Sequence, residues 1–159
     1  MAVGTVSSVD SDVWQLIATN SPSAASSTSF SSISGYKKLM VVWQVTASTT
    51  GANNWLLVRL NSDSTSGNYG SIAALDGTNV NRSLSSFYVT AYTDTGGVTG
   101  YAIISDTDKT TPKFLEKVGS NDALITSGIY VGSSAVTALS LHTNTGTITG
   151  TVSLYGIAA

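Results

Sequence analysis

The side chains that could do chemistry in this chain are few and scattered. His142 is the only histidine and cysteine is absent, so neither a Cys-His pair nor a zinc site with several His or Cys ligands can form. A Ser-His-Asp triad is conceivable on paper, but the G-x-S-x-G pattern that presents the serine on a strand-to-helix turn does not occur. We therefore expect His142 to be a partly exposed residue at a strand end, and the chain to be no enzyme.

Carboxylates offer two close pairs, Asp10 with Asp12 and Asp106 with Asp108. The Asp106-Thr107-Asp108 triplet alternates oxygen ligands as a calcium loop does, but it lacks the following glycine and the distant glutamate of an EF-hand. A solvated turn is the favoured interpretation, with calcium binding as the alternative. Nothing in the sequence selects two carboxylates as a glycosidase pair, and phosphate-binding loops are absent. We expect no cofactor.

The elements that must position these residues are predicted to be strands. Serine and threonine account for 26 and 22 of the 159 residues, 10% of the chain is charged, and 42% is hydrophobic. Short clusters of β-branched and aromatic residues, separated by Gly, Asn, Ser and Asp, predict an all-β fold: one antiparallel, jelly-roll-like β-sandwich of about 8–11 strands. The expected strands cover residues 13–19, 27–33, 38–47, 55–60, 68–73, 84–92, 101–105, 113–119, 124–131, 136–142 and 149–157.

Alternation along several of these segments predicts which side chains face the core. Phe87, Val89 and Ala91 form one apolar set, and Ile148, Val152 and Leu154 form another. The last strand is expected to lie beside an early strand. The Thr143-Asn144-Thr145-Gly146 segment is expected to be a tight hairpin, because Asn and Gly tolerate positive φ.

The first twelve residues differ in composition from the rest of the chain, which suggests that an N-terminal arm precedes a folded domain. Residues 1–12 are small and polar, with only Val3, Val6 and Val9 as apolar anchors, so we expect an extended N-terminal arm that makes assembly contacts. Residues 13–159 are expected to form the β-sandwich domain.

Charge and hydropathy exclude several classes of partner. The net charge is −2 and the seven basic residues are scattered, which gives no electrostatic footprint for nucleic acid. No apolar stretch approaches the roughly 18 residues of a transmembrane helix, and the N-terminus lacks the features of a signal peptide. We expect no nucleic acid and no membrane among the partners, and synthesis in a cytoplasm.

Loop and strand aromatics allow two interpretations. Trp55, Tyr69, Tyr88 and Tyr92 could stack on sugar rings beside Asn, Asp and Ser loops. Such residues more often fill a core or a subunit interface, and that interpretation is favoured here.

Four segments spread over most of the chain resemble the small β-sandwich virion proteins of tailed bacteriophages, of head-decoration, tail or fibre type. The resemblance is carried by Trp14-Gln15-Leu16-Ile17, by Phe30 to Tyr36, by Arg59-Leu60-Asn61 with Asn68-Tyr69, and by Leu154-Tyr155-Gly156-Ile157. These are patterns of a scaffold. They imply a jelly-roll-like sandwich, oligomeric, in a virus particle that is made in the host cytoplasm.

The resemblance and the single compact domain favour a non-enzymatic head-decoration, or capsid cement, protein on the particle surface. Its expected partners are copies of itself and other virion proteins, above all the major capsid protein. The expected contact residues are Val3, Val6 and Val9 of the arm, with Trp55 and Tyr69 of the domain. The alternative is a tail or fibre module that binds a receptor or a carbohydrate, with a glycan of the host surface as the partner.

Overall fold

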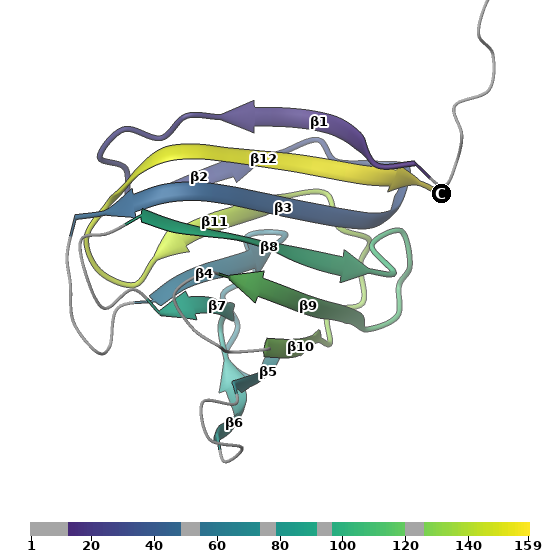
Figure 1. Ribbon diagram of the computed structural model, residues 1–159. Helices are drawn as coiled ribbons and strands as arrows, with labels where there is room; N and C mark the ends of the chain where they lie inside the picture. The colour runs from purple at the N-terminus through teal and green to yellow at the C-terminus, as the bar shows by residue number, and fades with distance from the viewer. Residues whose placement is uncertain (1–12, 49–54, 74–78, 92–96, 120–125) are drawn as a thin grey trace, which may run out of the picture.

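Two antiparallel sheets pack face to face in a computed structural model of the chain (Figure 1). The structure describes residues 13–48, 55–73, 79–91, 97–119 and 126–159. Within them, one sheet has the strand order β1-β12-β3-β8-β9-β10-β5-β6 and the other β2-β11-β4-β7. The strands are β1 Gln15–Asn20, β2 Ser27–Phe30, β3 Tyr36–Ala47, β4 Trp55–Leu60, β5 Tyr69–Ala73, β6 Asn79–Leu84, β7 Phe87–Ala91, β8 Gly97–Ser105, β9 Lys113–Gly119, β10 Thr126–Tyr130, β11 Leu139–Thr143 and β12 Ile148–Ala158.

Eight of these strands form a jelly roll. β1-β12-β3-β8 lies against β2-β11-β4-β7. The chain passes from one sheet to the other between β1 and β2, β2 and β3, β3 and β4, β4 and β5, β6 and β7, β7 and β8, β10 and β11, and β11 and β12. β9 and β10, then β5 and β6, extend the first sheet beyond β8. This confirms the predicted all-β, jelly-roll-like sandwich in a single domain.

The described residues form twelve strands, more than the 8–11 expected. The additional strand is β6, Asn79–Leu84, whose sequence NVNRSL lacks a run of apolar residues. Among the described residues, no helix has the length and apolarity needed to cross a membrane.

The core lies between the sheets and is built from alternate strand positions. The buried residues of β3 are Leu39, Val41, Trp43 and Val45. In the facing sheet, Val58 and Leu60 of β4 and Leu139 and Leu141 of β11 are buried in the same alternating way. The predicted inward positions are confirmed for Phe87 and Val89 and for Ile148, Val152 and Leu154, all at most 1% exposed. The last strand pairs with β1 and β3, as expected.

The prediction of a tight hairpin at 143–146 is wrong. β11 pairs with β2 and β4, whereas β12 belongs to the other sheet, so this segment is a corner between the sheets. Gly146 has a φ of 75°, and the hydroxyl of Thr143 donates to the Gly146 carbonyl at 2.9 Å. The residue types at 143–146 therefore predict a turn, which the structure contains, but they do not predict that it joins two different sheets.

Candidate functional site

The outer face of the eight-stranded sheet carries large apolar side chains. Leu16, Phe114 and Val118 are 58%, 55% and 53% exposed, and Tyr101 is 38% exposed. Single exposed apolar residues are normal on protein surfaces, but a contiguous group marks an interaction site.

Strand register places these residues side by side. Val42 of β3 lies opposite Tyr101 of β8, which lies opposite Val118 of β9. In a second row, Leu16 lies opposite Tyr155, which lies opposite Met40 and then Ile103. Since directly paired residues share a face of the sheet, these rows form one surface. We call it the apolar face: Leu16, Met40, Val42, Tyr101, Ile103, Phe114, Val118, Ile129 and Tyr155.

Two opposite charges lie on the apolar face. Lys38 follows the alternation of Met40 on β3, and Glu116 lies opposite Ile103. The two lysines of β9, Lys113 and Lys117, are buried on the inner side of the sheet. Across the described positions of β1, β12, β3, β8, β9 and β10, Lys38 and Glu116 are the outward-facing charges.

The predicted contact residues of the domain, Trp55 and Tyr69, do not lie on the apolar face. Val3, Val6 and Val9 lie outside the described residues. Trp55 is half-buried on the four-stranded sheet, with its ring edge-on to Tyr88 at 5.1 Å between centroids and 87° between planes.

The prediction that Tyr69 contacts a partner is corrected by the structure, because its side chain is fully buried and cannot reach one. Its hydroxyl accepts from the Leu60 amide at 3.0 Å and is within hydrogen-bond distance of the Leu60 and Asp63 carbonyls. Its ring packs against Phe87 and Tyr130. Burial raises the pKa of Tyr69 well above its ordinary value. The core interpretation therefore applies to this residue.

Asp63 organises the polar turn beside Tyr69. Its carboxylate accepts from the Asn68 amide at 2.7 Å, from the Thr65 backbone amide at 2.9 Å and from the Tyr130 hydroxyl at 2.9 Å. These hydrogen bonds, that from Asn68 first, hold the pKa of Asp63 well below its ordinary value. The role of Asp63 is to stabilise the turn in its ionised form.

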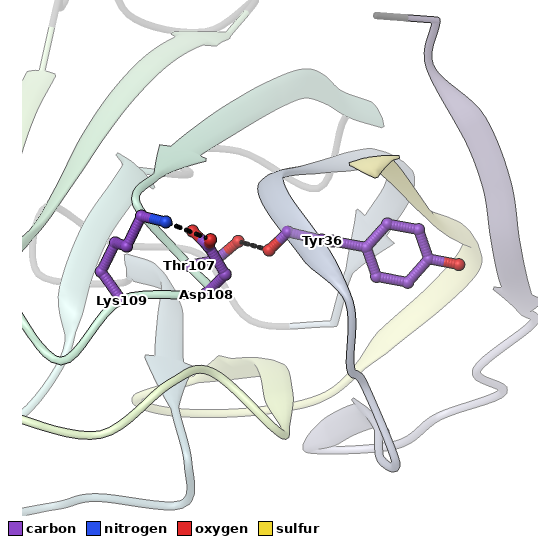
Figure 2. Close-up of polar contacts among 4 residues, drawn as sticks. All are labelled: Tyr36, Thr107, Asp108 and Lys109. Atoms are coloured by element: carbon purple, nitrogen blue, oxygen red, sulfur yellow. Dashed lines mark hydrogen bonds and ion pairs between the residues drawn. The ribbon is translucent and has the colours of Figure 1, made fainter. Parts of the chain in front are cut away.

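The Asp106-Thr107-Asp108 triplet forms a turn that is tied to β3. Figure 2 shows the Thr107 hydroxyl donating to the Tyr36 carbonyl at 2.6 Å and the Lys109 ammonium bound to Asp108 at 2.6 Å. The bond to Lys109 lowers the pKa of Asp108. Among the described residues no group of three or more His, Cys, Asp or Glu side chains could hold a metal ion. The contacts of Asp108 are those of a turn.

His142 lies on the outer side of β11, with Nε2 3.3 Å from the Ser86 hydroxyl. Burial, with a smaller contribution from Arg59, lowers the pKa of His142 to about 4. The Ser86 hydroxyl is also 2.6 Å from the Ser85 carbonyl, and His142 Nδ1 is buried without a partner in the described part of the chain. A Ser-His pair without an orienting acid, and with so weak a base, is poorly suited to activate a nucleophile.

Comparisons with known proteins give no family. No family model matches the chain, and no curated protein matches it. Among solved structures, a crystal structure of the exo-inulinase of Aspergillus awamori aligns with 93% of this chain and 29% of its own, at 16% identity and a TM-score of 0.47. This chain thus spans less than a third of that protein. A likeness this remote carries no argument about activity.

Proposed function

We propose that the chain is a non-enzymatic structural protein of a bacteriophage particle, of head-decoration type, that associates with a second copy of itself through the apolar face. The particle role rests on the sequence resemblance. The association rests on one observation, the contiguous exposed apolar residues on the outside of the eight-stranded sheet.

The extent of the apolar face supports a protein interface. Six neighbouring strands at about 4.8 Å each, and five residues at about 3.3 Å along each strand, give a footprint of about 480 Å² for the region that holds these residues and the serines and charges between them. Exposed patches of about 300–600 Å² are often functional. Stacked sheets pack about 10 Å apart with interdigitated side chains, and a second copy offers a face of the same shape.

The two charges of the apolar face favour a two-fold pair. Lys38 and Glu116 lie on either side of the central strand β8. A two-fold axis that runs parallel to β8, midway between the two faces, would place Lys38 of each copy near Glu116 of the other. Such an interface is isologous and closes on itself, and its charges are complementary, which favours correct partners and register.

Replacing Phe114 with aspartate tests the association. Phe114 is 55% exposed and occurs twice in a two-fold interface. Since only the exposed half of Phe114 can become buried on association, its loss costs about 0.8–1.6 kcal/mol per copy and weakens the pair by at least about tenfold. Sedimentation velocity over a concentration series is expected to show a dimer for the unmodified protein and a monomer for Phe114→Asp at the same concentrations.

The matched control is Ser29→Asp, which introduces the same side chain at an exposed position of β2 in the other sheet. It should leave the dimer unchanged. A protein that stays monomeric at hundreds of micromolar, or a Phe114→Asp variant that associates as strongly as the unmodified chain, would exclude association through the apolar face.

A further inference from the structure

A second surface feature lies on the opposite side of the molecule. The outer side of the four-stranded sheet contains a cavity of about 440 Å³, which is within the size range of small-molecule sites. Its lining includes Leu57 and Arg59 of β4, Tyr88 of β7 and His142 of β11. Alternate residues of the same strands, such as Val58 and Leu141, are in the core, so the cavity is separate from the space between the sheets.

Arg59 is the charged group among the described residues that line this cavity, and hydrogen bonds from its Nε fix the orientation of its guanidinium. Its Nε donates to the Ser85 carbonyl and the Ser86 hydroxyl, each at 3.2 Å. Within the described residues, no carboxylate pairs with its guanidinium. A guanidinium presents a fork of donors that matches an oxyanion such as a carboxylate. The cavity therefore has an oriented positive charge that a ligand could neutralise.

The remaining lining combines an aromatic ring with hydroxyl and amide groups. Trp55 packs edge-on against Tyr88 and fixes the ring of this lining residue. The Asn144 side-chain oxygen accepts from the Trp55 amide at 2.7 Å, which orients another lining group. Ser86 and Thr143 add hydroxyls. An apolar patch of ring size beside several hydroxyls suits a small polyhydroxylated ring better than a purely apolar molecule.

We infer that this cavity binds an acidic saccharide, with the sugar carboxylate against Arg59 and the ring beside Tyr88. This goes beyond assembly through the apolar face, because the two surfaces lie on different sheets and neither needs the other. The described lining residues supply no second charge at neutral pH, since His142 is neutral there. One carboxylate per sugar therefore matches the charge of the cavity.

The single histidine gives a direct spectroscopic readout. His142 lines the cavity, and its pKa is held down by burial and by the charge of Arg59. The other titratable group that faces the cavity from the packed strands is Tyr88 of β7. A bound carboxylate offsets the repulsion from Arg59, so it should move the imidazole resonance and raise the pKa of His142. A neutral sugar should do neither.

The experiment is a proton NMR titration of the His142 ring in tag-free protein with D-glucuronate, N-acetylneuraminate, D-glucose and acetate at constant ionic strength. At least one acidic sugar is expected to bind at least tenfold more tightly than glucose and acetate. Arg59→Gln should weaken that binding at least tenfold, while Lys109→Gln, at a lysine outside the cavity, leaves it unchanged. Thermal unfolding verifies that Arg59→Gln is folded, and Arg59→Lys, which retains charge but not the fork, should bind with intermediate affinity.

Three outcomes would overturn the inference. The acidic sugars could bind no better than glucose, binding could survive Arg59→Gln, or acetate could bind as tightly as the acidic sugars. The last result would mean that the cavity takes an isolated anion and does not recognise a sugar. None of these outcomes bears on the association through the apolar face, which sedimentation tests separately.

Discussion

Gly150→Ala is expected to lower the free energy of unfolding by about 3–5 kcal/mol. Gly150 lies in β12 with a φ of +147°. Residues that carry a side chain rarely adopt this backbone conformation. A Cβ there would lie 2.2 Å from the Gln44 carbonyl oxygen and 2.8 Å from Val45 Cα. Both atoms belong to the backbone of β3, the strand with the most extensive pairing to β12, so neither can yield without disrupting the sheet. Backbone strain and overpacking each cost about 1–3 kcal/mol.

Urea unfolding measures this change, and Gly97→Ala is its matched control. Gly97 also pairs with β3, but among the described residues the nearest atom to a Cβ there would be the Val45 carbonyl oxygen at 4.0 Å. Its replacement should change stability by less than about 1 kcal/mol. If Gly150→Ala is too unstable to purify while Gly97→Ala is normal, the expectation is met. Equal stabilities for the two variants would contradict the close approach of β12 to β3.

Lys113→Met is expected to have the second largest effect, a loss of about 2–4 kcal/mol. The Lys113 side chain is fully buried, and its ammonium donates to the Gly132 carbonyl at 3.0 Å and the Ser134 carbonyl at 2.6 Å. Burial lowers the pKa of Lys113. Methionine retains most of the apolar stem but leaves two carbonyls without a donor, and unsatisfied buried groups cost about 1–3 kcal/mol each.

Lys109→Met is the control for Lys113→Met. Its ammonium is exposed and pairs with Asp108 at 2.6 Å, and exposed ion pairs contribute little to stability. Thermal unfolding at pH 7 should therefore separate the two variants clearly. A Lys113→Met variant as stable as Lys109→Met would show that the segment from Gly132 to Ser134 does not depend on this lysine.

The sandwich could be predicted because apolar and polar residues alternate over long strands. β3 shows this best, since Leu39, Val41, Trp43 and Val45 are buried while the residues between them are not. The sequence predicts no strand over β6, because its apolar residues are too few to form a pattern. The hairpin prediction at 143–146 was wrong because turn residues report local φ, whereas sheet membership depends on contacts distant in sequence.

The apolar face could not be predicted from local patterns. In β9 the usual rule places lysine outside and phenylalanine inside, but Lys113 and Lys117 are buried while Phe114 and Val118 are exposed. Lys113 faces inward because its ammonium donates hydrogen bonds to two loop carbonyls, and these contacts form only in the folded chain. The cavity around Arg59 likewise joins β4, β7 and β11, whose pairing the sequence alone does not specify.

The central claim, that two copies meet through the apolar face, is tested most directly by reversing its two charges. Dimer dissociation constants from sedimentation equilibrium are needed for Lys38→Glu, for Glu116→Lys and for the double variant. Each single reversal creates two like-charge contacts in a two-fold pair and should weaken the dimer by about tenfold or more, while the double variant should return to within about threefold of the unmodified protein. An equimolar mixture of the two single variants should also form a mixed dimer. A double variant as weak as the single variants combined would contradict the claim.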